Sequence, residues 1–75
     1  MQILMPQLND AGDPGEVQEI FVRIGDVVAL GQKLLAVEME KAVIEIEATA
    51  AGRVTGILVQ PGEQIAPGRV LFDVE

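Results

Sequence analysis

Short runs of branched apolar residues alternate with polar residues along the whole chain, and turn residues separate these runs. Val17, Ile20 and Val22 follow the spacing Val-x-x-Ile-x-Val, and the same spacing returns 37 residues later. Alternation of this kind is typical of strands that bury one face. No segment keeps a 3.6-residue period, so we expect no helix longer than one turn.

The second half of the chain repeats the first. A shift of 37 positions superimposes ten identical residues in a window of 24, from Gly15 on Gly52 to Glu38 on Glu75. We expect Gly15 and Gly52 to allow close packing of the backbone. Each copy continues through a glycine turn, a two-residue strand, a second glycine turn and an apolar closing strand. The predicted short strands are 27–28 and 64–65, and the closing strands are 34–37 and 70–74.

Each copy also has an opening strand, at 2–5 and at 42–47. In the second of these, Ile44 and Ile46 share one face while Glu45 and Glu47 share the other. Short strands with regular turns predict an all-β sandwich or flattened barrel. Two similar halves predict a pseudo-twofold axis, which places the join of the halves at one end and both termini at the other.

Composition narrows the possible functions. A chain of 75 residues makes one small domain, residues 1–75. Its net charge of −7 and its lack of Trp and Tyr argue against nucleic acid as a partner. The chain contains no Cys or His, so we expect neither a disulfide nor a metal site. We also expect no membrane span, because no apolar run is long enough, and no catalytic site, because no constellation of titratable residues supports one.

The join of the two halves, from Glu38 to Lys41, is expected to be an exposed hairpin tip. Only two lysines are present, and we expect Lys33 to be an ordinary solvated side chain. Taken alone, a lysine on an exposed turn is also an ordinary charge. It cannot catalyse without a neighbouring base, metal or apolar pocket. On a rigid tip, however, Lys41 offers an amine that can carry another group through an amide bond.

Nearly the whole chain fits one spaced pattern of glycines, apolar residues and acids. The pattern is Met5-Pro6-x-Leu8, Gly15-x-Val17-x-x-Ile20-x-Val22, Gly25-Asp26-x-Val28, Gly31-Gln32-x-Leu34-x-x-Val37-Glu38 and Lys41-Ala42-x-x-Glu45-Ile46. It resembles the lipoyl domains of the acyltransferase (E2) components of 2-oxo acid dehydrogenase complexes. The resemblance implies a flattened barrel of two four-stranded antiparallel sheets, with a lipoyl group in amide linkage to Lys41.

The resemblance also implies a carrier function. The lipoyl arm would receive an acyl group from a thiamine-diphosphate decarboxylase (E1) and deliver it to coenzyme A at the E2 acyltransferase core. A dihydrolipoyl dehydrogenase (E3) would then reoxidise it. A lipoate-protein ligase would read the residues around the lysine, which are Glu38, Met39, Glu40 and Ala42. The loop from Gln7 to Pro14 is expected near the tip, as a surface for discrimination by E1 or equally as a tolerated insertion.

The chain departs from the family pattern at the tip. Lipoyl domains usually show Glu-Thr-Asp-Lys-Ala, whereas this chain has Glu38-Met39-Glu40-Lys41-Ala42. Biotinyl domains typically place Met on both sides of the lysine. The flanks Glu40 and Ala42 favour lipoate, while Met39 keeps a biotinyl carrier of a biotin-dependent carboxylase as the alternative. An unmodified interaction module of the same fold is the third possibility.

The sequence leaves several questions open. It does not identify the 2-oxo acid, since pyruvate, 2-oxoglutarate, branched-chain acids and acetoin-type substrates share this tip. It is compatible with a domain of a larger E2 or with a standalone carrier. Both the bacterial cytoplasm and the mitochondrial matrix fit it.

Overall fold

The computed structural model describes residues 1–75 as eight strands with no helix. The strands are β1 (Gln2–Leu4), β2 (Gly15–Ile20), β3 (Val27–Val28), β4 (Lys33–Met39), β5 (Ala42–Glu47), β6 (Gly52–Ile57), β7 (Gln64–Ile65) and β8 (Val70–Val74). All the predicted strands are present. The first predicted closing strand was too short, because β4 begins at Lys33 and continues to Met39, and the first opening strand ends at Leu4. The alternating stretches end earlier than expected, because β2 stops at Ile20 and β6 at Ile57, so Val22 and Val59 lie beyond them. No helix of this structure meets the length and hydropathy that crossing a membrane requires.

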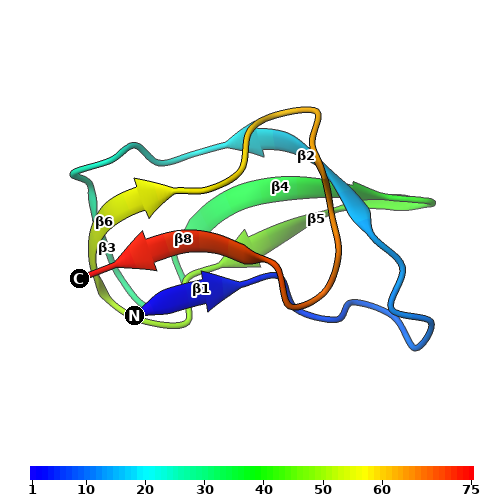
Figure 1. Ribbon diagram of the computed structural model, residues 1–75, viewed down its shortest axis with the longest axis horizontal. Helices are drawn as coiled ribbons and strands as arrows, with labels where there is room; N and C mark the ends of the chain where they lie inside the picture. Colours follow the sequence, from blue (N-terminus) through cyan, green and yellow to red (C-terminus); the bar gives the residue numbers. More distant parts are fainter.

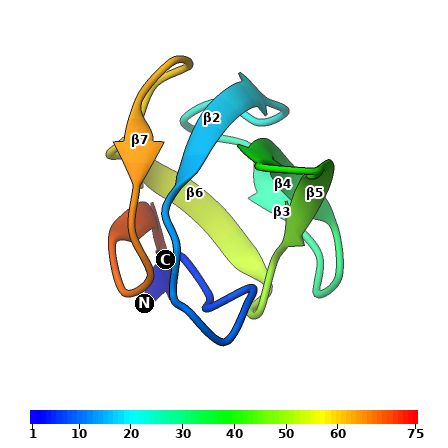
Figure 2. The ribbon, with the colours of Figure 1, turned by 90° about the vertical axis from the view of Figure 1, so that its right-hand side faces the viewer.

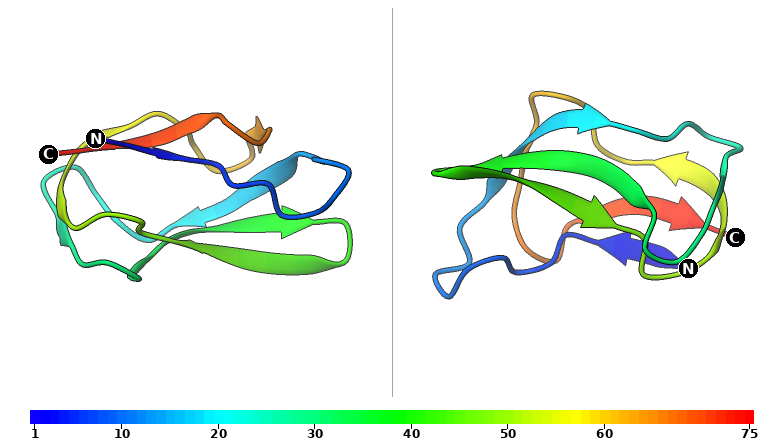
Figure 3. Two further views of the ribbon diagram at one scale, coloured as in Figure 1. Left: turned by 90° about the horizontal axis from the view of Figure 1, so that it is seen from below. Right: turned by 180° about the vertical axis from the view of Figure 1, so that it is seen from behind.

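The strands form two four-stranded antiparallel sheets, as the resemblance implied. Their orders are β1-β8-β6-β3 and β5-β4-β2-β7. Seen from below, the two sheets lie face to face as the layers of a flattened barrel (Figure 3). The short strands join the two halves of the chain, because β3 pairs with β6 and β7 pairs with β2.

Hydrogen bonds repeat with the 37-residue shift and confirm the pseudo-twofold axis. The Gly25 N–H donates to the Val54 carbonyl at 2.7 Å, and the Gly62 N–H donates to the Val17 carbonyl at 2.7 Å. These two glycines have φ values of 98° and 90°, a region that side chains strongly disfavour. Each copy therefore uses a glycine turn to reach across to the other copy.

The side chain that follows each of these glycines caps the same turn. The Asp26 carboxylate accepts a hydrogen bond from the Arg23 N–H at 2.9 Å. The Glu63 carboxylate accepts one from the Gln60 N–H at 3.3 Å. The acidic match between Asp26 and Glu63 in the repeat thus has a local structural role.

The core fills the space between the sheets and contains no buried polar side chain. Leu35 of β4 and Phe72 of β8 occupy equivalent positions in the two halves, and both are completely buried. The buried apolar cluster consists of Ile3, Met5, Val17, Val22, Val28, Leu34, Leu35, Val37, Ile46, Ala48, Val54, Val59, Ile65, Leu71, Phe72 and Val74. Burial of this branched surface is the main stabilising term in a domain that has no disulfide.

The two ends of the molecule carry different parts of the chain. Both termini lie at one end, where the Met1 ammonium donates a hydrogen bond to the Val74 carbonyl at 2.7 Å (Figure 1). The β4–β5 hairpin projects at the opposite end, and the long loop between β1 and β2 lies near it (Figures 1 and 2). The molecule measures 32 × 21 × 17 Å. The predicted placement of the tip and the loop is therefore confirmed.

Candidate functional site

The hairpin tip is a two-residue turn made by Glu40 and Lys41. Met39 of β4 and Ala42 of β5 pair directly below it, and Glu38 pairs with Val43. The expectation that Glu38 to Lys41 form the tip was too broad, because the pairing of β4 with β5 keeps Glu38 and Met39 in the strand. No residue other than glycine has a positive φ, so the turn does not require glycine at either position.

Lys41 is exposed and makes no ion pair. The two ion pairs of the structure belong to two of the other four basic residues, Lys33 and Arg69. Lys41 also donates no side-chain hydrogen bond, although Glu40 is its neighbour in sequence. Its ammonium group is thus free of contacts that a modification would have to break.

Lys33 differs from the expectation of an ordinary solvated side chain. Its ammonium nitrogen lies 2.8 Å from a carboxylate oxygen of Glu45. The hydrogen bond and the charge of Glu45 raise the pKa of Lys33 above its usual value of 10.5. The side chain remains exposed, but it already has a partner, so the two lysines of the chain are not equivalent.

The four residues expected to surround the attachment site divide into two groups. Glu38, Glu40 and Ala42 are exposed, and Glu38 lies opposite Glu16 of β2 on the outer face of the sheet. Met39 is half-buried and packs against the core. The tip therefore presents two carboxylates and a small residue around Lys41, while the methionine turns inward.

Gly15 of β2 makes room for this inward methionine. A Cβ atom at Gly15 would lie 2.8 Å from the Met39 Sδ atom and would collide with Cγ1 of Val37. The equivalent Gly52 is similarly crowded, because its Cβ would lie 2.7 Å from Cγ1 of Val74. The expectation that these two glycines allow close packing is confirmed.

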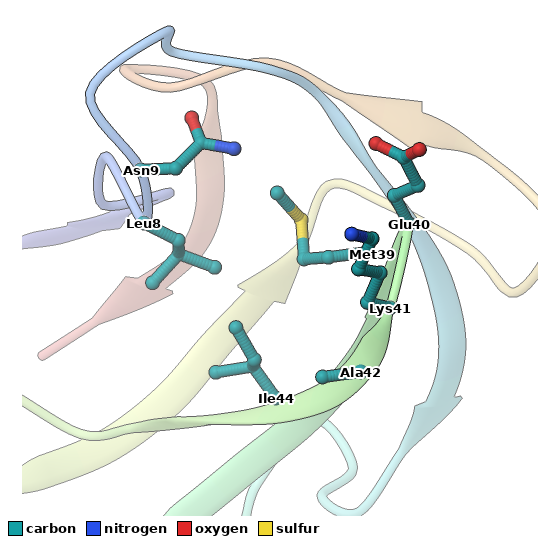
Figure 4. A pocket seen from close by; sticks show the side chains of 7 residues that line it. All are labelled: Leu8, Asn9, Met39, Glu40, Lys41, Ala42 and Ile44. Carbon is teal, nitrogen blue, oxygen red and sulfur yellow. The ribbon is translucent and has the colours of Figure 1, made fainter.

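An open depression of about 350 Å³ lies beside Lys41. Leu8 and Asn9 of the β1–β2 loop form one wall, and residues 39–42 and Ile44 of the hairpin form the other. Figure 4 shows the side chains of Met39 and Ile44 turned toward Leu8. The sequence repeat predicted the loop near the tip but did not identify Leu8, Asn9 and Ile44 as lining residues. The signal available was an apolar Leu8 within a loop that is otherwise mostly polar.

Hydrogen bonds within the loop fix the position of this wall. The side chain of Gln7 donates to the Asn9 carbonyl at 3.0 Å. The side chain of Asn9 in turn donates to the Asp13 carboxylate at 3.2 Å and accepts from the Asp13 N–H at 3.1 Å. Leu8 lies between these anchored residues and packs against the core. The loop is thus a folded structure of its own.

The chemistry of the tip suits the presentation of one exposed amine, Lys41, to which another group can be attached. The tip consists of one free amine, flanking carboxylates and a small apolar depression, and no group of metal-ligating side chains occurs in the structure.

The family model described as "Biotin-requiring enzyme" matches residues 1–74. The chain belongs to this biotin/lipoyl attachment family. Members carry a lipoyl or biotinyl group covalently on a lysine, so the chain is a carrier domain.

The chain is similar both to acyltransferase components of 2-oxo acid dehydrogenase complexes and to a biotin carboxyl carrier protein. It is 41% identical over 61 residues to the dihydrolipoyllysine-residue acetyltransferase component of the pyruvate dehydrogenase complex of Mycoplasma capricolum, a match that covers 81% of this chain and 14% of that protein. It is 40% identical over 62 residues to the biotin carboxyl carrier protein of acetyl-CoA carboxylase of Pyropia yezoensis, covering 83% of this chain and 38% of that protein. The chain thus spans a small part of the first relative and less than half of the second.

A solved structure shows the same fold. The lipoyl domain of the 2-oxoglutarate dehydrogenase complex from Azotobacter vinelandii superimposes with a TM-score of 0.77 at 23% identity. The superposition covers 100% of this chain and 95% of that domain. This lipoyl domain therefore has the same all-β architecture of two four-stranded sheets.

Proposed function

We propose that the chain is a lipoyl carrier domain of a 2-oxo acid dehydrogenase complex, with the lipoyl group attached to Lys41. The observation that carries this proposal is the position of Lys41 in a two-residue turn at the end farthest from the termini. Its amine is exposed and unpaired, so an amide bond there breaks no contact in the domain. The other lysine, Lys33, already pairs with Glu45.

The residues around Lys41 fit recognition by a lipoate-protein ligase. Glu38 and Glu40 present carboxylates on the approach to the turn, and Ala42 leaves the other side open. Met39 sets the shape of the turn from below through its packing on the core. We assign these four residues to ligase recognition, with Glu40 and Ala42 as the immediate flanks of the modified lysine.

The chain's own contribution is to hold the lysine on a rigid support. The β4–β5 ladder continues to the pair Met39–Ala42, so the turn cannot fold back onto the sheet without breaking strand pairs. A lipoyl group bound there supplies a disulfide that accepts an acyl group together with two reducing equivalents. The partners are the E1 decarboxylase, the E2 acyltransferase core and the E3 dehydrogenase, which the domain visits at high effective concentration when tethered.

A biotinyl carrier of a biotin-dependent carboxylase is the second candidate. It is favoured by the similarity to the biotin carboxyl carrier protein of Pyropia yezoensis and by a methionine two residues before the lysine. Ala42 matches the lipoyl pattern and Glu40 keeps its acidic residue before the lysine, whereas the biotinyl pattern has methionine at both positions. The acyltransferase similarity covers a comparable share of the chain at comparable identity. The flanking residues therefore favour lipoate.

Acyl transfer to the lipoylated domain tests this function. The domain is incubated with E1 components specific for pyruvate, 2-oxoglutarate, branched-chain 2-oxo acids or acetoin, each with its substrate, and its intact mass is followed. We expect a gain of one acyl group with one of the four systems, and none for the matched Lys41→Ala variant. The Lys33→Ala variant serves as the control and should be acylated normally. Acylation of Lys41→Ala, or retention of the domain on streptavidin after treatment with biotin ligase, would contradict the proposal.

A further inference from the structure

The depression beside Lys41 has no counterpart in the other half of the repeat. Its loop wall, with Leu8 and Asn9, comes from the long β1–β2 connection, which spans residues 5–14, whereas the equivalent β5–β6 connection spans only residues 48–51. Its other wall is the hairpin tip, and the corresponding end of the molecule holds the chain termini. The fold alone does not require this depression. The chemistry of its lining is therefore the guide to what binds there.

The lining is mainly apolar, and its polar members are Asn9, Glu40 and Lys41. Leu8, Met39 and Ile44 are each half-buried, and Leu8 and Met39 rest on the core behind them. Their side chains converge on one another across the depression (Figure 4). A volume of about 350 Å³ lies at the lower end of the range for small-molecule sites. It suits a small ring with an aliphatic chain better than a peptide segment.

The atom that would bear the prosthetic group lies at the rim. Lys41 is itself one of the lining residues, so anything attached to its amine is held at high local concentration over the depression. Amide formation also removes the positive charge of this lysine, which makes the rim less polar. Any other apolar ligand would have to compete with an occupant that is permanently tethered.

We propose that this depression is a rest site for the disulfide ring carried on Lys41, an inference that rests on the proposed function. The five-membered ring and its pentanoyl chain fold back onto Leu8, Met39 and Ile44 when no partner enzyme is bound. The ring has no hydrogen-bond donor, so an apolar lining leaves no group of it unsatisfied. The ureido ring of biotin has two N–H donors and a carbonyl, and burying these against apolar side chains is unfavourable.

Methionine methyl groups provide a direct test by NMR. The chain has only three methionines, and they lie in different surroundings. Met39 lines the depression, Met5 is buried in the core, and Met1 is 78% exposed at the opposite end. With ¹³C-methyl methionine, lipoylation should shift the Met39 signal and produce cross-peaks between this methyl group and the ring protons. The Met1 signal should not move.

The rate at which a phosphine reduces the ring gives a second readout that needs no enzyme. A trialkylphosphine attacks one sulfur and breaks the S–S bond, while water supplies the oxygen of the phosphine oxide and the two thiol protons. Only extended arms react, so a rest state occupied by about 50–90% of molecules slows reduction about two- to tenfold. Leu8→Ser and Ile44→Ser should each restore the rate of free lipoamide.

Leu30→Ser is the matched control for Leu8→Ser. Leu30 is 72% exposed and precedes β4, so a strand of seven residues, about 23 Å long, separates it from the tip. This variant should keep the slow reduction of the wild-type domain. Folding of each variant is checked by circular dichroism before loading.

The outcomes separate the two proposals. Absence of a lipoyl mass increment at Lys41 after ligase treatment would contradict the proposed function and the rest site together. A loaded domain whose Met39 signal lacks ring cross-peaks and whose ring is reduced as fast as free lipoamide would overturn the rest site alone. Slow reduction that persists in both Leu8→Ser and Ile44→Ser would also overturn it, because the ring would then rest elsewhere.

Discussion

Gly15 and Val37 should be energetically coupled, because a methyl group at one position occupies the space of a methyl group at the other. A Cβ built on Gly15 collides with Cγ1 of Val37, which is completely buried. Gly15→Ala alone should therefore cost about 1–3 kcal/mol through overpacking. Val37→Ala alone removes two buried methyl groups and leaves a cavity, which should cost about 2–3 kcal/mol.

The double variant should be much less destabilised than the sum of the two single variants. The methyl group introduced by Gly15→Ala fills part of the space that Val37 vacates, so the net loss is one methyl group, about 1–1.5 kcal/mol. The two single costs sum to about 3–6 kcal/mol, so the coupling should be about 2 kcal/mol or more. Gly25→Ala provides the control, because a Cβ there meets no atom within 4 Å and the cost of this substitution comes only from its φ of 98°, which Val37 does not affect. Its combination with Val37→Ala should be additive within about 0.5 kcal/mol.

Urea unfolding followed by circular dichroism is the suitable assay. The chain has no Trp or Tyr, so intrinsic fluorescence gives no signal. A domain of this size has about 3–5 kcal/mol of stability, and single variants that approach this limit can be measured in a fixed concentration of a stabilising osmolyte. If the loss in Gly15→Ala/Val37→Ala equals the sum of the single losses, the proposed contact between β2 and β4 is wrong.

Three further predictions concern the two lysines and the core. Lys41→Ala should change the free energy of unfolding by less than about 0.5 kcal/mol in thermal melts, because the exposed tip contributes little packing, and a larger loss would count against a purely presenting role. The pKa of Lys33 is raised in the folded state, so the stability it contributes is present below pH 10.5 and is lost as the pH rises through the folded pKa. Urea midpoints measured above and below this pH should show this fall in the wild type and a smaller one in Glu45→Gln. Phe72→Ala should cost about 3–5 kcal/mol, comparable to the whole stability, so its circular dichroism spectrum should be largely that of an unfolded chain.

The repeat in the sequence was the strongest source of structural information. It predicted both two-residue strands, β3 and β7, which are too short to be recognised from alternation alone. It also predicted which end of the molecule carries the hairpin tip. These predictions succeeded because a twofold arrangement of similar halves fixes relative positions without any knowledge of side-chain packing.

Features that depend on strand register could not be predicted in the same way. Lys33 lies beside Glu45 because the pairing of β4 with β5 shifts between Lys33 and Leu35, and no local pattern reveals that irregularity. The extension of β4 through Glu38 and Met39 likewise depends on the partner strand. Polar residues near a turn give no signal that distinguishes a strand end from a loop.

The depression at the tip was the least predictable part of the site. It arises from segments that are distant in sequence, and its shape depends on Met39 turning inward over Gly15. The sequence showed that Gly15 is needed for close packing, but it did not show which side chain uses the space. That assignment requires the three-dimensional contact between β2 and β4.

Site-resolved mass analysis shows which lysine, if either, carries a prosthetic group and which group it is. The domain is treated with lipoate-protein ligase and lipoate, or separately with biotin ligase and biotin, and is then cleaved after glutamate. This cleavage places Lys33 and Lys41 in different peptides, because Glu38 and Glu40 lie between them. We expect one lipoyl increment, confined to the peptide that contains Lys41, and no biotin increment. A biotin increment, an increment on Lys33, or no increment from either ligase would contradict it.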